Sequence, residues 1–393
     1  MSKTTLPTYG SFINALYTSG YSHAALRFWQ WQFIFCRYPR PVIAASITSP
    51  LAVRTAASPD LGPSPAFLLS SVHGMIDSGA ATIRGMKESE FLTWVYKKSR
   101  KSRAVPVPVG DDMAAIRLPH GSGEPLILLK IDQCLDQVHF DLRCHAPGLI
   151  GRKAVNRCLS DCAAMAALPV AILIAVALPE DASLPWTRKL FLGCESAAKK
   201  FNCALVGGDT AIWNQRLAIT VAAFGLPRHR PVLRSGARPG DVICVTGPLG
   251  GSIRSRHLTF TPRIGLARRL VETAQVHAMM DISDGLAIDL PRMLAMSGAG
   301  AEIDADRIPI HPDARRLARD DHRIPLHHAL CDGEDYELLF TVAPRDAARL
   351  TARRLPIHTI GRITRAENKI ELISNGRRIP WPAGGWNHGA GRP

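Results

Sequence analysis

From Lys87 to the C-terminus, short apolar runs alternate with amphipathic stretches. The runs are rich in β-branched residues, which favours strands, while the stretches between them place apolar residues at helical spacing. The predicted strands are Leu126–Ile131, Val170–Leu178, Leu217–Phe224 and Asp241–Thr246, and the predicted helices are Gly148–Ala167 and Trp186–Phe201. This alternation predicts a mixed α/β (α+β) protein.

The segment Leu226–Gly240 is the predicted domain boundary, because three prolines and two glycines interrupt the periodicity before a new strand begins at Asp241. A chain of 393 residues is also longer than the roughly 250 to 300 residues that one core usually serves. We therefore predict an N-terminal domain over residues 87–227 and a C-terminal domain over residues 233–393. Residues 1–86 show no sustained periodicity, so we expect a disordered extension or a start assigned too far upstream, with a targeting or membrane-surface segment as the alternative.

The net charge of +15 does not by itself choose a partner. The excess of basic residues is spread along the chain, and its densest cluster, from Lys97 to Arg103, follows the apolar stretch Phe91–Tyr96. Cations are favoured at the C-terminus of a helix, so we expect a solvated helix end here, with anion steering as the alternative. We predict no nucleic-acid partner, which would require a salt-dependent affinity for DNA or RNA.

Apolar runs and cysteines limit the class of protein further. No apolar run reaches the roughly 20 residues that a membrane-spanning helix needs, so we predict no membrane partner. The nine cysteines include no CxxC pair, which indicates neither a disulfide framework nor a structural zinc site. Cys158 and Cys162 are expected to pack as small apolar groups on a helix. We expect a reducing compartment and a cytoplasmic location.

Acidic residues are scarce but recur in short, turn-like contexts at six places. These are Gly110-Asp111-Asp112, Asp132, Ser160-Asp161, Gly207-Gly208-Asp209-Thr210, Asp281-Ile282-Ser283-Asp284-Gly285 and Gly333-Glu334-Asp335. Any one of them is typical of a helix cap or a turn. Together they offer the short oxygen ligands that Mg²⁺ prefers in phosphate chemistry, so the functional interpretation is a site with several Mg²⁺ ions.

Two of these places are more specific. Gly207-Gly208-Asp209 follows the run Cys203–Val206, which predicts a strand that ends in glycines where a phosphate could approach the backbone. Asp281 and Asp284 bracket Ser283 before an apolar stretch, which predicts a helix N-terminus suited to phosphate. The sequence contains no Gly-x4-Gly-Lys-Ser/Thr loop, no kinase-type HRD or DFG set and no dinucleotide fingerprint, so a nucleotide would bind through another architecture.

In their order along the chain, these blocks resemble the signature of the thiamine-monophosphate kinase family. The blocks are Gly110-Asp111-Asp112, Asp132 with Val138-His139-Phe140, Gly151-Arg152-Lys153-Ala154, Leu159-Ser160-Asp161-Cys162-Ala163-Ala164-Met165, Gly207-Gly208-Asp209-Thr210, Asp281-Ile282-Ser283-Asp284-Gly285-Leu286 and Gly333-Glu334-Asp335-Tyr336-Glu337-Leu338-Leu339-Phe340. The resemblance spans about Lys87 to the end. It implies the two-domain α/β fold of aminoimidazole ribonucleotide synthetase and selenophosphate synthetase, with N-terminal domains pairing in a homodimer. It also implies that ATP phosphorylates thiamine monophosphate to thiamine diphosphate with several Mg²⁺ ions.

The resemblance further implies roles for individual residues. It implies Mg²⁺ binding by Asp112, Asp132, Asp161, Asp209, Asp281 and Asp284. It implies ATP binding by Gly208, Asp209, Arg234 and Ser283, and thiamine monophosphate binding by His139, Glu334 and Trp386. Arg234 also fits a phosphate as a planar donor fork, and Trp386 fits a cationic thiazolium ring as an aromatic face. The alternatives are a solvated linker residue at Arg234, a packing residue at Trp386 and a structural histidine at His139.

The chain departs from the family pattern just before Asp132. Where the family has two hydroxyl residues that are expected metal ligands, this chain has Lys130 and Ile131, and Cys158 stands where an asparagine is common. Three consequences are open: one metal ion is lost, Lys130 replaces a cation with its own charge, or activity is reduced.

The implied reaction is direct in-line attack by an oxygen of thiamine monophosphate on the γ-phosphorus of ATP. That oxygen is already anionic near neutral pH, so the reaction requires no general base. One alternative is a ligand-binding homologue that has lost turnover through the change at Lys130 and Ile131. Another is an ATP-dependent enzyme of the same fold that makes an amidine or a selenophosphate, although the folded part has no Cys-Lys neighbour for the latter.

Overall fold

The computed structural model describes residues 88–98, 101–118 and 125–385, all within the unit Ala81–Pro393 that the contacts of the chain define. The predicted extension over residues 1–86 and the predicted ligand Trp386 lie outside the described residues. In the described part of the chain, no helix is both long and apolar enough to cross a lipid bilayer.

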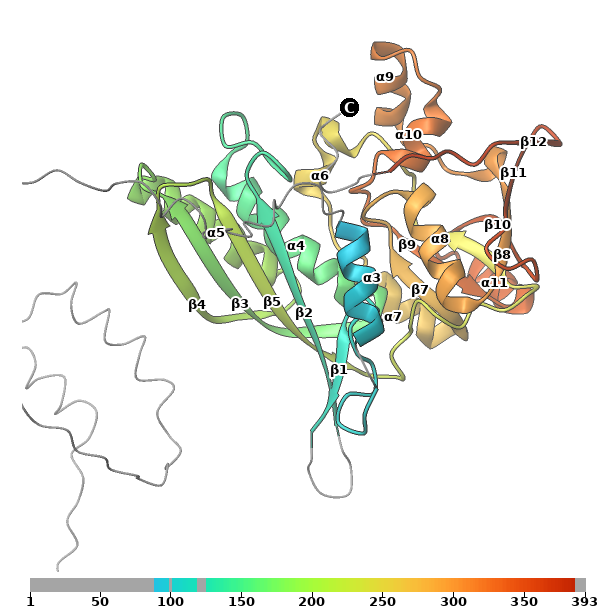
Figure 1. The fold of residues 1–393 in the computed structure, drawn as a ribbon, viewed down its shortest axis with the longest axis horizontal. Helices are drawn as coiled ribbons and strands as arrows, with labels where there is room; N and C mark the ends of the chain where they lie inside the picture. Colours follow the sequence, from blue (N-terminus) through green and yellow to red (C-terminus); the bar gives the residue numbers. More distant parts are fainter. Residues whose placement is uncertain (1–87, 99–100, 119–124, 386–393) are drawn as a thin grey trace, which may run out of the picture. The chain divides into compact units, whose positions relative to one another are not determined.

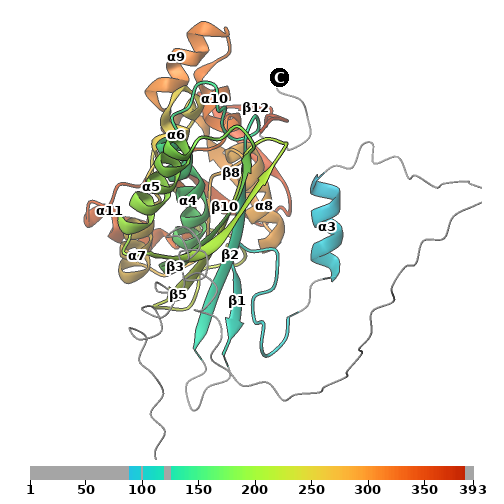
Figure 2. The same ribbon diagram turned by 90° about the vertical axis from the view of Figure 1, so that its left-hand side faces the viewer.

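The N-terminal half is built on a five-stranded sheet with the order β1-β2-β5-β3-β4. Its strands are β1 (Ala114–Arg117), β2 (Leu126–Leu135), β3 (Ala167–Pro179), β4 (Ala204–Trp213) and β5 (Ala218–Pro227), and its helices are α3 (Glu88–Lys98), α4 (Pro147–Ala164) and α5 (Leu184–Lys199). Helices α4 and α5 pack against each other and lie together on one face of this sheet (Figures 1 and 2). The three strands and two helices that the sequence predicts in this half are confirmed.

The C-terminal half is built on a seven-stranded mixed sheet with the order β12-β11-β8-β10-β6-β9-β7. Its strands are β6 (Val242–Val245), β7 (Val276–Asp281), β8 (Gly300–Asp304), β9 (Leu338–Val342), β10 (His358–Thr364), β11 (Ile370–Ser374) and β12 (Arg377–Ile379). Its helices are η2 (Ser252–Arg254), α6 (Arg256–Thr259), α7 (Ile264–Thr273), α8 (Leu286–Ser297), η3 (Ala305–Arg307), α9 (Pro312–Asp320), α10 (Pro325–Cys331) and α11 (Pro344–Ala352). The predicted mixed α/β fold with two domains is confirmed.

Helix α4 connects the two halves because it is buried on most of its circumference. One side packs against β2, β3 and β5, and the other contacts α6, α7 and β7. A helix without a polar outer face has to be covered on all sides. Its polar side chains at Lys153, Asn156, Ser160 and Asp161 are buried with the rest. Helix α4 therefore places buried polar side chains between the two halves.

The prediction that a strand ends at Gly207-Gly208-Asp209 is wrong, because β4 continues through the glycines to Trp213. Gly208 pairs with Ile174 of β3, and a Cβ atom at Gly208 would lie 1.8 Å from the carbonyl oxygen of Ile174. The glycine thus allows β4 to approach β3 closely, a packing role that a glycine pair in the sequence does not distinguish from a phosphate turn.

Two smaller predictions are confirmed. Helix α3 ends at Lys98, with Lys97 and Lys98 in its last turn, where cations interact favourably with the free carbonyl groups. Cys158 and Cys162 are fully buried in α4, and burial raises the pKa of both thiols. A buried thiol with a raised pKa is unreactive and acts as a small packing group.

Candidate functional site

Three predicted metal ligands lie together where the segment before β1, helix α4 and the end of β7 meet. Asp112, Asp161 and Asp281 are all buried, and each offers an oxygen atom within 4.8 Å of the others. Asp281 Oδ2 accepts a hydrogen bond of 2.6 Å from Ser160 Oγ, whereas Asp112 Oδ2 is buried without a hydrogen-bond partner. Hard oxygen ligands in this number, one of them unsatisfied, fit a Mg²⁺ ion.

Burial raises the pKa values of two of these carboxylates, Asp161 and Asp281, and neighbouring carboxylates add to the effect. Burial, reinforced by the charge of Asp112, raises the pKa of Asp281 to about 6. Burial also raises the pKa of Asp161 well above its usual value, although Lys130 acts in the opposite direction. Loss of water and proximity of like charges both disfavour the ionised form, so a bound cation would stabilise this cluster.

Basic side chains pair with the carboxylates that the N-terminal half contributes. The pairs are Lys130 Nζ with Asp161 Oδ1 at 2.9 Å, Arg157 Nε with Asp132 Oδ2 at 3.4 Å, and Arg234 Nη2 with Asp112 Oδ1 at 2.7 Å. Each pair is largely shielded from water, so its charges interact more strongly than they would at the surface.

Two of these cations are firmly held. Burial opposes the charge of Lys130, but the carboxylates of Asp161 and Asp132 outweigh this effect and raise the pKa of Lys130 above its usual value. The backbone N–H of Arg234 donates a hydrogen bond of 2.8 Å to Asp111 Oδ1, in addition to its side-chain pair. Arg234 is therefore a half-buried, ion-paired residue and not the solvated linker residue of the alternative interpretation.

A second polar group surrounds Glu334, a predicted substrate contact. The ammonium group of Lys153 lies 2.7 and 2.8 Å from the two carboxylate oxygens of Glu334, and 2.7 Å from His257 Nδ1. Lys153 also donates a hydrogen bond to the carbonyl oxygen of His139, another predicted substrate contact. Burial raises the pKa of Glu334, but Lys153 outweighs this effect and holds the pKa below its usual value. The buried lysine thus brings His139 and Glu334 together.

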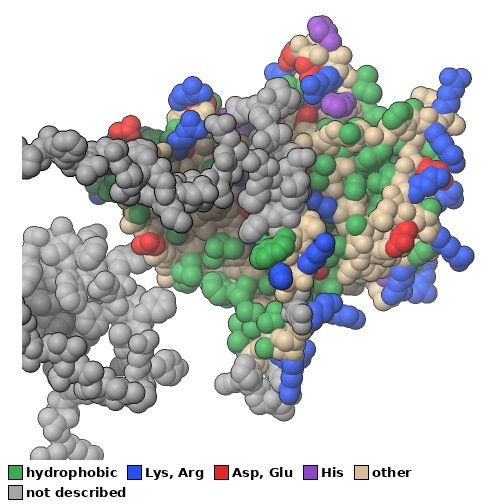
Figure 3. Space-filling model, viewed as in Figure 1, with side chains coloured by type: hydrophobic (Ala, Val, Ile, Leu, Met, Phe, Trp, Pro, Cys, Tyr) green, Lys and Arg blue, Asp and Glu red, His purple; other side chains and the backbone are tan. Residues whose placement is uncertain are grey.

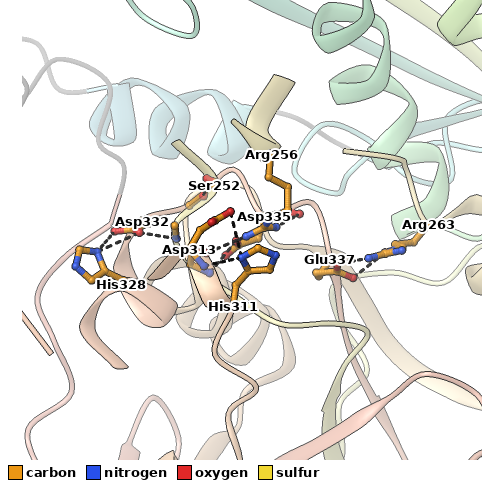
Figure 4. A network of polar contacts seen from close by, with 12 residues as sticks. Ser252, Arg256, Arg263, His311, Asp313, His328, Asp332, Asp335 and Glu337 are labelled. Atoms are coloured by element: carbon orange, nitrogen blue, oxygen red, sulfur yellow. Dashed lines mark hydrogen bonds and ion pairs between the residues drawn. The ribbon is translucent and has the colours of Figure 1, made fainter. Parts of the chain in front are cut away.

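The backbone on both sides of Glu334 is fixed by hydrogen bonds. Glu334 has a φ of 52°, a left-handed conformation that is uncommon for residues other than glycine. Asp332 accepts a hydrogen bond of 2.7 Å from the backbone N–H of Gly251. Asp335 accepts one of 2.9 Å from the backbone N–H of Gly250, within the network of Figure 4. These acidic neighbours hold the turn that presents Glu334.

Ser283 and Asp284 lie in the turn before α8, which begins at Leu286 as the sequence predicts. Their backbone N–H groups donate to Asp289 Oδ2, at 3.0 and 2.9 Å respectively. The carboxylate of Asp284 pairs with Arg292. The turn follows Asp281 directly along the chain, and the roles of both residues in binding nucleotide and metal stay predictions.

Gly208 and Asp209 lie apart from the carboxylate cluster. The strand pairings place Gly208 of β4 and Asp132 of β2 in the same lateral row of the sheet. The two residues are separated by three strand spacings, a distance of about 14 Å. Asp209 is exposed and, as the next residue of β4, lies on the opposite face of the sheet. Within one chain the structure does not bring Asp209 to the other predicted ligands.

The sequence did not identify Lys153, Arg157 or His257 as site residues. Lys153, Arg157 and Asp161 are spaced four residues apart, so they form one stripe along α4. A stripe of charged residues at this spacing is a signal that the sequence does contain. The partners of the stripe come from β2 and from the C-terminal half, and only the folded chain identifies them.

Comparisons with known proteins agree with this arrangement. Two family models match the chain: AIR synthase related protein, N-terminal domain, over residues 110–226, and AIR synthase related protein, C-terminal domain, over residues 238–373. The thiamine-monophosphate kinase of Rhodopirellula baltica is 39% identical over 282 residues, which cover 70% of this chain and 89% of that protein. The thiamine-monophosphate kinase of Methanospirillum hungatei is 34% identical over 282 residues, which cover 69% of this chain and 90% of that protein.

A solved structure described as AaThiL complexed with AMPPCP and TMP is similar to this chain. It is 29% identical, with a TM-score of 0.66, and the match covers 77% of this chain and 97% of that chain. The two matched family models together include every predicted metal ligand of the chain. The matched family models and these relatives show that the chain belongs to the thiamine-monophosphate kinase family.

Proposed function

We propose that the protein transfers the γ-phosphoryl group of ATP to thiamine monophosphate and releases thiamine diphosphate. The observation that carries this proposal is the convergence of Asp112, Asp161 and Asp281, from both halves of the chain, on one buried cluster. Such a cluster suits the metal-bound triphosphate of a nucleotide. The relative complexed with AMPPCP and TMP supports the same pair of ligands here.

The proposal assigns three groups of residues. Mg²⁺ is bound by Asp112, Asp161, Asp281 and Asp284. Asp132, which pairs with Arg157, and Asp209, which lies on the opposite face of the sheet within one chain, stay predicted ligands. ATP is bound by Gly208, Asp209, Arg234 and Ser283, and thiamine monophosphate by His139, Glu334 and Trp386. Lys153 links the carboxylate of Glu334 to the backbone carbonyl oxygen of His139, which supports a common place for these two residues, while His139 Nδ1 accepts a hydrogen bond of 3.0 Å from the backbone N–H of Leu135.

The contribution of the chain to the reaction is positioning. The attacking phosphate oxygen of thiamine monophosphate is already anionic, so no side chain has to remove a proton in this in-line transfer. Arg234 presents a rigid donor fork to a phosphate, and Ser160 fixes one oxygen of Asp281 through its hydrogen bond. Lys153 holds the carboxylate of Glu334 in one orientation for the acceptor substrate. Bound Mg²⁺ supplies neutralisation of the charge on the phosphates.

The test is to incubate the purified protein with ATP, Mg²⁺ and thiamine monophosphate and to measure thiamine diphosphate and ADP. We expect equal amounts of both products. A single turnover with ATP labelled in the γ-phosphate should leave no label on the protein, and a phosphorylated protein intermediate would contradict direct transfer. A folded protein that binds both ligands but forms no product would instead support the homologue without turnover.

Metal affinity is expected to fall as the pH drops through about 6, because protons compete with metal ions for carboxylates. Burial and Asp112 raise the pKa of Asp281 to about 6, so this ligand is ionised above that pH and protonated below it. For one displaced proton, the dissociation constant of Mn²⁺ should rise by about tenfold between pH 7 and pH 5. Calorimetric titration with Mn²⁺ alone measures this change, and the Asp281→Asn variant should lack the step near pH 6.

We also propose that the protein is a homodimer in which a second copy covers the free face of the five-stranded sheet. Helices α4 and α5 cover only one face, and residues of the other face remain exposed, including Ile131 at 66% and Trp213 at 42%. Hydrophobic side chains gather over these strands in Figure 3. An apolar sheet face without a partner is typical of an interface between chains.

Changing Ile131 to lysine is expected to convert the dimer to a monomer, because a charge would be buried in an apolar interface. Sedimentation velocity measures the change in mass. The matched control is Ile324→Lys, since Ile324 is 62% exposed and precedes α10 in the other half of the chain. A wild-type protein that sediments as a monomer at micromolar concentration would contradict the proposed dimer.

A further inference from the structure

Lys130 lies in the middle of β2 with its ammonium group in the carboxylate site. In the sheet, Lys130 pairs with Ala223 of β5. Its side chain lies on the same face of β2 as that of Asp132, because side chains two positions apart in a strand point in the same direction. Lys130 Nζ donates a hydrogen bond of 2.9 Å to Asp161 Oδ1. Only 25% of the Lys130 side chain and 8% of the Asp161 side chain are exposed. Lys130 is therefore part of the site and not a surface lysine that lies near it.

The positive charge of Lys130 is stabilised by two carboxylates of the site. Its ammonium group contacts Asp161 Oδ1 at 2.9 Å, and the charge of Asp132 also attracts it. Arg157 lies 3.4 Å from Asp132 and adds a second fixed positive charge on this side. In a partly buried site, a divalent ion at contact distance from an ammonium group is strongly repelled. An ion bound by Asp132 and Asp161 together and the ammonium group of Lys130 therefore exclude each other.

Asp161 also shares a cluster with Asp112 and Asp281, which offer further oxygen atoms to a metal ion. Asp281 accepts its hydrogen bond from Ser160, a neutral hydroxyl group, at 2.6 Å. Asp112 Oδ2 is buried without a hydrogen-bond partner. The three carboxylates of Asp112, Asp161 and Asp281 each offer an oxygen atom within 4.8 Å of the others, so a divalent ion can bind them together. Arg234 pairs with the other oxygen of Asp112, Oδ1, at 2.7 Å.

We propose that Lys130 takes the place of one divalent ion in this site. Its ammonium group supplies the positive charge between Asp132 and Asp161, and divalent ions bind on the side of Asp112 and Asp281. This inference rests on the proposed function, because it concerns how the same site is loaded. The protein therefore binds one divalent ion fewer than a variant with a neutral residue at position 130.

The test counts the Mn²⁺ ions bound to the full-length protein in the presence of AMPPCP, by equilibrium dialysis. Lys130→Thr removes the charge and adds a neutral oxygen, Lys130→Ala removes the charge alone, and Lys130→Arg keeps it. Lys199→Thr is the matched control, because Lys199 is exposed on α5 and pairs with Glu195. We expect one additional Mn²⁺ ion per chain in the threonine and alanine variants, and the wild-type number in the other two.

Equal numbers of Mn²⁺ ions in the wild-type protein and in both neutral variants, all folded by circular dichroism, would overturn the inference. An additional ion in the threonine variant alone would also overturn it, because an added ligand and not the lost charge would then decide the count. If the threonine variant does not fold, the alanine variant decides. Formation of thiamine diphosphate by the wild-type protein tests the proposed function separately, so a failure of one is distinguishable from a failure of the other.

Discussion

Replacing Asp281 with asparagine is expected to lower kcat for thiamine diphosphate formation by about a thousandfold, which corresponds to about 4 kcal/mol of transition-state stabilisation. Asp281 supplies one of the three clustered carboxylates. Asparagine has nearly the same shape, and its side-chain oxygen can still accept the hydrogen bond from Ser160. The loss should therefore come from the missing charge and not from altered packing. Steady-state assays at saturating substrate and Mg²⁺ measure it.

The same variant is expected to be at least as stable as the wild-type protein at pH 7.5 without metal. Burial and Asp112 raise the pKa of Asp281 to about 6. A carboxyl group whose pKa rises on folding stabilises the fold only while it is protonated, and this contribution is lost as the pH rises from about 4 to about 6. Asparagine carries no charge and avoids that loss. A marked fall in the Tm of the Asp281→Asn variant would mean that misfolding causes the loss of activity. The control is Asp320→Asn at an exposed position, which should change neither Tm nor kcat.

Replacing Lys153 with methionine is expected to lower the free energy of unfolding by about 3–5 kcal/mol, the usual effect of removing one partner of a buried ion pair. The Lys153 side chain is completely buried and that of Glu334 is 18% exposed. Without Lys153 the carboxylate would keep, among the described residues, only longer contacts, of 3.3 Å each, with His257 Nδ1 and the hydroxyl group of Tyr336. At about 2 °C for each kcal/mol, Tm should fall by roughly 6–10 °C. Lys199→Met, at an exposed pair, should change stability by less than about 1 kcal/mol.

A double variant separates the ion pair from simple packing. In Lys153→Met combined with Glu334→Gln, the uncompensated charge is gone, so at least half of the lost stability should return. Thermal unfolding of the two single variants and the double variant gives the coupling energy. Strictly additive losses would contradict the ion pair. The double variant should still have a raised KM for thiamine monophosphate, because the proposed contact at Glu334 is missing.

The local pattern of apolar and polar residues was sufficient to predict the main helices and strands and the order of the acidic motifs. The helix from Pro147 to Ala164 and the strand from Ala167 to Pro179 were predictable from the spacing of apolar residues. The direction of the side chains repeats every 3.6 residues in a helix and every two residues in a strand, so this spacing is a local property of the sequence. The turn before Leu286 was predictable for the same reason, since the acidic residues and glycine precede an apolar stretch directly. The end of a strand at Gly207-Gly208 was predicted wrongly, because the close approach of β3 lies outside the local sequence.

The sequence by itself determined a mixed α/β chain, a set of aspartates in a recognisable order and the departure at Lys130. It could not determine which charges meet. Lys153 and Glu334 are 181 positions apart and Ser160 and Asp281 are 121 apart, so their contacts exist only once the two halves enclose α4. Tertiary structure decided that Lys130 faces Asp161, that Asp112, Asp161 and Asp281 share one cluster and that Asp209 does not join it within one chain. The physical reason is that side-chain periodicity fixes the face of an element on which a residue lies, whereas packing of distant elements fixes what that face meets.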